Sequence, residues 1–408
     1  MKKLLQVLIL FFILCFSFFI QAQPKLKIYI VSHNEDNIGY LNGIGGYNRY
    51  LKSRSALISL CDMVQSKKLA YDYGADYIAL QAIAKFDTGS VITLTNNKNL
   101  VKWMKEDKGI ECDPHAHESA YNYADVAYLM SQLGITPTNV MSGFLYDTVL
   151  LNGVSWEKYQ NGVTGDSFPN FTWYPEILWG AANLQHFDDP QYSGVYKPKS
   201  MAEFTVHEPS NNLILCGTGC ELKLEDTTTV AAKFAQIKKL VNDIQNGTLP
   251  ANGIYTQEIF FSEGDMTYTW FYPLIDQLTD SINTLVKEGK VEWETISDIV
   301  TEWKANGENA FAIDCSYNPI LPSVTDIKEN NQTKNLPLIY PNPGNGLLYF
   351  NNLQSGLNHL RIYNQVGQCI FRKEIFSEYK YIDCSFLPEG IYYFQLNENA
   401  QKYILIQK

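Results

Sequence analysis

Short apolar runs alternate with amphipathic stretches over residues 24 to about 312, and this alternation constrains the fold more than any other feature. We expect strands at 25–32, 139–145, 212–217, 254–261 and 291–296, and helices at 55–70, 98–109, 122–134, 229–247 and 271–289. Strands that alternate with helices indicate parallel β-α-β units. Roughly seven or eight such units in about 290 residues predict an α/β fold, a (β/α)-barrel-like domain over 23–312.

Two polar motifs fall at the ends of predicted strands, where such folds place their working residues. HNED occupies 33–36, and ECDPHAHES occupies 111–119 after a helix that closes at Gly109. If the second motif is extended, Asp113, His115 and His117 point to one side, with Cys112 on the other. Two imidazoles and a carboxylate suit a divalent ion, most simply zinc. The same spacing also occurs in a solvated turn, and Pro114 can interrupt the extended run.

Both ends of the chain differ in composition from its middle. Residues 1–22 contain two lysines, a long apolar run and Ala22, which predicts a secretory signal peptide, with a membrane anchor as the alternative. Residues 313–335 are polar and aperiodic, and we interpret them as a linker. From about 336 to 408, short alternating strands broken by turn residues predict a small all-β, Ig-like sandwich.

The net charge of −11 without a cluster of lysines and arginines argues against a nucleic-acid partner. Residues 150 to 210 are rich in Trp, Tyr, Pro and Gly, which predicts long loops over the mouth of a pocket, with rings that could contact a sugar. Seven cysteines follow the predicted signal peptide, so at least one thiol is unpaired within the chain. Cys216 and Cys220 could form a small local disulfide or remain inert thiols, and Cys112 is expected to be a buried core thiol.

The C-terminal residues resemble the sorting domain of type IX secretion cargo over some 70 positions. The match runs through YPNPGNGLLYF (340–350), LRIYNQVGQCIF (360–371), DCSFLPEGIYYFQL (383–396) and KYILIQK (402–408). The resemblance implies an export signal that the type IX secretion machinery recognises at the outer membrane. It also implies secretion or display at the cell surface, with a lipopolysaccharide anchor as one outcome.

The larger domain more loosely resembles polysaccharide deacetylases of the NodB-like group, which carry two acids after the first strand and a histidine pair after a later one. Glu35 and Asp36 stand in the acid position, and GIECDPHAH (109–117) is similar up to His115. The second histidine of this chain is His117, where the family has His-x-x-x-His. The resemblance implies a metal-dependent hydrolase of carbohydrate, with Glu35 as general base and Asp36 as a metal ligand.

The expected chemistry assigns the metal to Asp36, His115 and His117, and the water proton to Glu35 or Asp113. His207 could protonate the leaving group, although a structural role is also open, and a structural role is expected for His33. Two further hypotheses remain. One is a metal-independent glycoside hydrolase that pairs Glu35 with Asp113 or Glu258. The other is a surface protein that binds glycans without catalysis.

Overall fold

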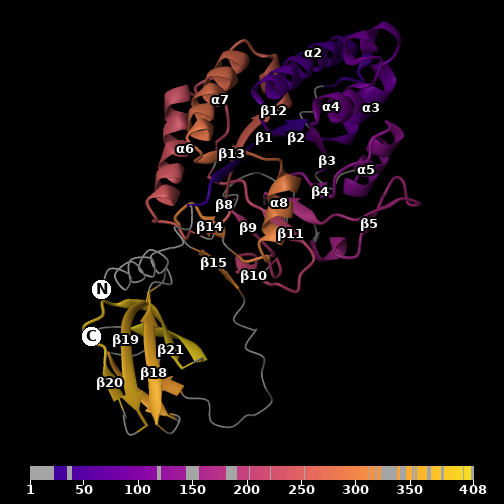
Figure 1. Cartoon of the computed structure of the whole chain (residues 1–408). Coiled ribbons are helices and arrows are strands. Elements are labelled where there is room, and N and C mark those ends of the chain that lie inside the picture. Colours follow the sequence, from indigo (N-terminus) through magenta and orange to yellow (C-terminus); the bar gives the residue numbers. More distant parts are fainter. Residues whose placement is uncertain are drawn as a thin grey trace, which may run out of the picture. The chain divides into compact units, whose positions relative to one another are not determined.

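The chain forms two compact units, residues 1–323 and 324–408, which we describe separately from a computed structural model (Figure 1). The structure describes residues 23–34, 39–116, 121–143, 156–180, 191–201, 203–220, 222–251, 253–310, 312–317, 319–322, 338–340, 346–351, 353, 356–364, 369–377, 381–397 and 399–405. The predicted signal peptide, 1–22, lies outside this part of the chain.

A parallel sheet lies at the centre of the first unit, in the order β12 (Tyr255–Ser262), β1 (Leu26–Asn34), β2 (Tyr71–Ala75) and β3 (Glu111–Pro114). β13 (Val291–Trp293) pairs with the first residues of β1, before β2 begins to pair with it. Every residue of β1 is buried. Strands covered on both faces appear as continuous apolar runs, which is why this strand could be predicted from the sequence.

A second sheet has the order β4 (Val140–Met141), β7 (Ile177–Trp179), β11 (Ile214–Cys216) and β9 (Val195–Tyr196). A parallel bridge between His115 and Ser142 links β3 to β4. On the other side, the Glu258 amide of β12 donates to the Thr218 carbonyl at 2.7 Å, and the Leu224 amide to the Phe260 carbonyl at 2.8 Å. A closed (β/α) barrel requires contacts of this kind at both edges of the central sheet. The barrel itself stays a prediction.

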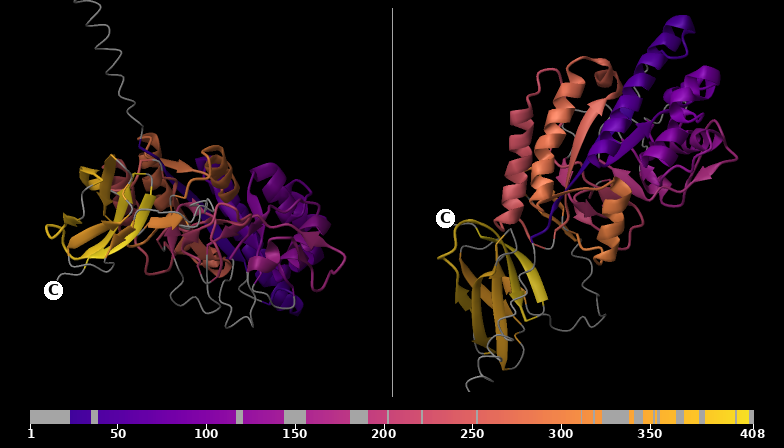
Figure 2. Two further views of the ribbon diagram at one scale, coloured as in Figure 1. Left: turned by 90° about the horizontal axis from the view of Figure 1, so that it is seen from below. Right: turned by 45° about the horizontal axis from the view of Figure 1, so that its top comes forward.

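The two faces of the central sheet pack against different partners (Figures 1 and 2). Leu26, Ile28 and Ile30 of β1 share a core with the helices, whereas Tyr29 and Val31 share one with the second sheet and α8 (Ile296–Ala305). This division follows the period-two alternation of strand side chains. The helices on the first face are α2 (Gly43–Lys67), α3 (Tyr77–Phe86), α4 (Leu100–Lys108), α5 (Tyr123–Gln132), α6 (Val230–Gln245) and α7 (Phe271–Lys287).

Local signals at the helix ends explain why several helices were predicted closely. Gly109, at φ 69°, ends α4 in the left-handed region that glycine tolerates. Asn122 and Asp125 form a reciprocal capping box at the start of α5. The 3-10 helices are Gly89–Thr95, Trp156–Tyr159 and η3 (Glu263–Thr267).

The predicted linker over 313–335 is wrong at its start. β14 (Ala312–Asp314) and β15 (Pro319–Pro322) pair with each other and with β8 (Tyr192–Ser193) and β10 (Val206–His207). Strands this short, one of them with proline at both ends, have no periodic pattern of apolar residues that would predict them. Their pairing with distant strands determines their conformation. The described part of 150–210 likewise contributes strands, including β7 and the hairpin of β5 (Val163–Thr164) and β6 (Thr172–Trp173).

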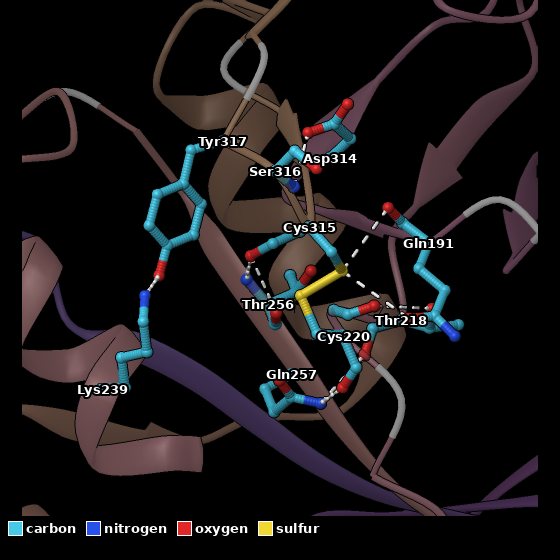
Figure 3. The surroundings of a disulfide bond; sticks show 12 residues. Gln191, Thr218, Cys220, Lys239, Thr256, Gln257, Asp314, Cys315, Ser316 and Tyr317 are labelled. Carbon is cyan, nitrogen blue, oxygen red and sulfur yellow. Dashed lines mark hydrogen bonds between the residues drawn. A yellow bond between two sulfur atoms is a disulfide. The ribbon is translucent and has the colours of Figure 1, made fainter.

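A disulfide fastens the last strands of this unit to the segment after β11 (Figure 3). It joins Cys220 to Cys315, across 95 positions of the sequence. The predicted local pair Cys216–Cys220 is therefore wrong. Cys216 belongs to β11 and is a buried free thiol, as is Cys112.

The second unit consists of two antiparallel sheets that share one core. The first has the order β16 (Leu338–Tyr340), β17 (Leu347–Asn351), β20 (Tyr381–Asp383). The second has the order β19 (Cys369–Phe376), β18 (Leu357–Tyr363), β21 (Gly390–Leu396), β22 (Asn399–Leu405). Leu348, Ile362 and Phe394 are among the core residues that both sheets contribute. The Ig-like topology stays a prediction.

Candidate functional site

Two histidines meet at the carboxyl ends of β1 and β3. The ring centroids of His33 and His115 are 4.6 Å apart, with an interplanar angle of 51°. His33 is 7% exposed and His115 is 0% exposed. The amide of His115 donates to the Ala75 carbonyl at 2.9 Å, which continues the β2–β3 ladder by one residue and fixes the backbone beneath the ring.

Small residues make the space that the His115 ring occupies. Gly143 has φ 65°, and a Cβ there would lie 2.2 Å from Cε1 of His115. A Cβ on Gly74 of β2 would lie 2.4 Å from the Ser142 hydroxyl oxygen and 3.4 Å from Nδ1 of His115. A side chain at either glycine would therefore collide with the histidine or its support.

Aromatic rings and a hydroxyl surround the pair. His33 meets Trp179 of β7 edge to face at 5.0 Å and Phe260 of β12 at 4.5 Å. Nδ1 of His115 lies 3.3 Å from the Ser142 hydroxyl oxygen, close enough to orient the ring. The result is a pair of imidazoles in a largely apolar setting, built from β1, β3, β4, β7 and β12.

A second polar group, the acidic cluster, consists of Asp72, Glu111 and Asp113. One carboxylate oxygen from each lies within 4.8 Å of the others, and all three side chains are buried. The parallel register places Asp72 opposite Glu111, and Asp113 follows two residues later on the same face.

Neighbouring donors anchor the acidic cluster. Oδ1 of Asp72 accepts from the Ile296 amide at 3.2 Å. Oε1 of Glu111 accepts from the Ser297 hydroxyl at 2.6 Å and from its amide at 3.2 Å. Asp113 accepts a hydrogen bond from the Thr138 hydroxyl. Amides of the first turn of α8 thus donate to two of the carboxylates, where the helix dipole favours negative charge.

The pKa values of all three carboxyl groups in the acidic cluster are raised. Burial raises the pKa of Asp72 well above its usual range, and the charges of Glu111 and Asp113 raise it further. Burial raises the pKa of Glu111 and of Asp113, in the latter with help from Glu111. Three carboxyl groups this close cannot all ionise without a compensating cation, so the cluster fits shared protons that tie α8 to β2 and β3.

The predicted site residues lie in different places. Asp113 belongs to the acidic cluster, whereas His115 belongs to the histidine pair. His207 lies on β10, where its Nδ1 accepts from the Lys197 amide at 3.0 Å and its ring meets Trp303 of α8 at 6.5 Å. Burial and the nearby Lys197 charge lower the pKa of His207. Glu35, Asp36 and His117 lie outside the described residues.

The sequence analysis expected a structural role for His33 and did not single out Ser142, Trp179 or Phe260, which the structure places around the histidine pair. Strand parity could have found His33, because it shares an inward face with Tyr29 and Val31. The other three come from different strands and meet only through tertiary structure. Glu258, the other acid considered as a partner of Glu35, and Glu263, at the start of η3, also lie in different surroundings. Glu258 is buried on β12, and Glu263 accepts a hydrogen bond from Tyr40 beside α2.

Comparisons with known proteins identify the second unit. Residues 338–407 match the secretion system C-terminal sorting domain. No curated protein matches the chain. One solved structure that matches is the dimeric latent PorU from Porphyromonas gingivalis, with a TM-score of 0.15 and 15% identity over 18% of this chain and 9% of that chain.

In the part of the chain that the structure describes, helices are too short or too polar to cross a membrane. The predicted sorting domain is confirmed, and with it the partnership with the type IX secretion machinery. Residues 338–407 are a sorting domain that directs this protein through type IX secretion to the cell surface or the extracellular space.

Proposed function

We propose that the first unit is a secreted metal-dependent hydrolase of carbohydrate, with polysaccharide deacetylation as its reaction and a (β/α) barrel as its scaffold. The observation that carries the proposal is the pair His33–His115. Strands that are distant in the sequence bring two buried imidazoles to 4.6 Å at their carboxyl ends. In parallel α/β folds, this edge of the sheet is where substrates and ligands bind.

The donor set suits zinc. Two nitrogens at 2.0–2.1 Å from one tetrahedral ion are about 3.3 Å apart, a separation that two rings at this distance can reach. Oxygen from Ser142 supports His115 as outer-shell partners support ligating histidines. We propose His33 as a ligand beside His115, and keep Asp36 and His117 as further proposed ligands.

A bound zinc ion would acidify a water molecule and polarise an acyl oxygen. The residues of the chain would bind and orient: the imidazoles hold the ion, and Trp179 and Phe260 keep bulk water from one side of His33. Glu35, two positions after His33, is the proposed base for the water proton.

We give Asp113 and His207 no part in this reaction. Asp113 is buried in the acidic cluster and accepts a hydrogen bond from the Thr138 hydroxyl, so it does not face a space where a substrate could bind. His207 is held by the Lys197 amide and packs against α8. The same burial of Asp113 disfavours a glycoside hydrolase that pairs it with Glu35, because both carboxyl groups must face the sugar.

Acetate release tests the proposal. The full secreted chain is incubated with acetylated xylan and with chitin oligomers, and acetate and new reducing ends are both measured. We expect acetate without reducing ends, abolished by a chelator and restored by zinc. His115→Gln should abolish release, whereas His359→Gln, at an exposed histidine of the second unit, should leave it unchanged. Reducing ends that persist after chelation would contradict the proposal.

A further inference from the structure

Exposed apolar side chains concentrate on the sorting domain. Among the described residues, ten large hydrophobic side chains are exposed, and six of them belong to the second unit. They are Tyr349, Leu357, Ile370, Phe376, Tyr381 and Phe386. Single exposed apolar side chains are common on soluble proteins, so the informative feature is where such side chains adjoin one another.

A cross-strand row of tyrosines runs over one sheet of this unit. The register places Tyr349 of β17 between Tyr340 of β16 and Tyr381 of β20. The rings of Tyr349 and Tyr381 are 6.1 Å apart, and the two residues are 39% and 56% exposed. Their strand neighbours Leu348 and Ile382 point the other way into the core. Tyr349 and Tyr381 therefore lie on the outer face, which we call the tyrosine face.

We propose that the tyrosine face, centred on Tyr349 and Tyr381, is the surface by which a protein of the type IX secretion machinery recognises this chain. The sorting domain must be bound by that machinery, and the matched residues, 338–407, include all three strands of this sheet. Tyrosine is enriched among residues that dominate binding energy, because its rigid ring buries a large area at a small cost in side-chain entropy.

The chemistry of the face defines the partner surface. The register places Leu347 opposite Asp383, two positions along the strands from the tyrosine pair and therefore on the same face. Asp383 is exposed, and hydrogen bonds from Ser385 hold its pKa below the usual range, so it carries a negative charge. A complementary protein would present apolar side chains to the rings and a lysine or arginine to Asp383.

A matched pair of exposed side chains provides the control. Leu357 and Phe376 lie directly opposite each other on β18 and β19 of the other sheet, 43% and 50% exposed. Replacing them by threonine removes a similar amount of exposed apolar surface from the same unit. A partner that binds exposed apolar surface in general would bind both threonine variants less well. A partner that binds the tyrosine face would bind only the variant at Tyr349 and Tyr381 less well.

The test is export of the full chain in a bacterium that carries the type IX machinery. Parent, Tyr349→Thr/Tyr381→Thr, Leu357→Thr/Phe376→Thr and Tyr349→Phe/Tyr381→Phe are tagged internally, and the ratio of exported to periplasmic protein is measured. We expect the ratio of exported to periplasmic protein to be lower by about tenfold or more in the tyrosine-to-threonine variant than in the parent, as loss of a dominant interface residue would cause. The other two variants should match the parent.

Folding of each purified variant is checked by thermal melting, because cross-strand aromatic pairs also stabilise sheets. If the double threonine variant melts early, Tyr381→Thr alone is used. Export at the parental level by a folded tyrosine-to-threonine variant would overturn the proposal, as would an equal loss in both threonine variants. A tyrosine face that pairs two copies of this chain would instead show parental export with loss of a dimer in solution.

Discussion

Removal of the Cys220–Cys315 disulfide should destabilise the first unit by an amount that follows from the loop it closes. The bond spans 95 positions. In the chain-entropy model, closing a loop of this length lowers the conformational entropy of the unfolded state, which raises the free energy of unfolding by about 4.7 kcal/mol at 25 °C. For a unit of about 300 residues, this corresponds to a fall in Tm of about 7 °C.

The assay is urea unfolding of the parent and of Cys220→Ser/Cys315→Ser, each with and without reductant. We expect the reduced parent to unfold at the same urea concentration as the variant. The urea midpoint of the variant should not change when reductant is added. Thiol titration in denaturant checks the pairing, because reduction should add two thiols to the parent and none to the variant. A loss below about 1 kcal/mol, or a parental thiol count that reductant leaves unchanged, would refute the reasoning.

Three further predictions concern buried groups. The raised pKa values of the acidic cluster mean that the folded chain holds protons that the unfolded chain releases, so this stabilisation is complete below pH about 4 and is lost as the pH rises above it. Urea unfolding from pH 4.5 to 8 should show a shallower decline for Asp72→Asn than for the parent, and an equal slope would contradict this. Gly143→Ala places a Cβ 2.2 Å from the His115 ring at a positive φ, and should cost about 1–3 kcal/mol in unfolding free energy and reduce zinc content. Arg54→Ala leaves the buried Asp87 without its ion pair at 2.8 Å and should cost about 3–5 kcal/mol by the same assay, whereas a cost below 1 kcal/mol would show that Asp87 needs no cation.

Elements with strong local signals were predicted closely. Strand 25–32 became Leu26–Asn34, and helices 98–109 and 122–134 became Leu100–Lys108 and Tyr123–Gln132. Each has either a continuous apolar run or a cap that fixes one end. The sorting domain was predicted because its turns and strands occur in a characteristic order.

Features that depend on distant partners could not be predicted. β14 and β15 are short and pair with strands more than 100 positions earlier. The residues 312–322 show no periodic pattern that would predict these strands. The Cys220–Cys315 bond has the same origin, since the nearer Cys216 turns into the core. The acidic cluster unites two strands and the start of α8, so its residues seemed unrelated in the sequence.

The candidate site was predictable in part. Period-two alternation placed Asp113 and His115 on one face, but it could not show that Asp113 lies deeper, among Asp72 and Glu111. Whether a side chain meets substrate or a buried neighbour is a property of packing, and local sequence does not encode it.

Metal content of the purified full chain tests the central claim most directly. Elemental analysis is performed on the parent, His33→Gln, His115→Gln and the control His359→Gln, each after dialysis against zinc and then against buffer. We predict about one equivalent of zinc in the parent and the control, and little in either of the other variants. A parent without bound metal, or a His33→Gln protein that retains a full equivalent, would contradict a metal site built on His33 and His115.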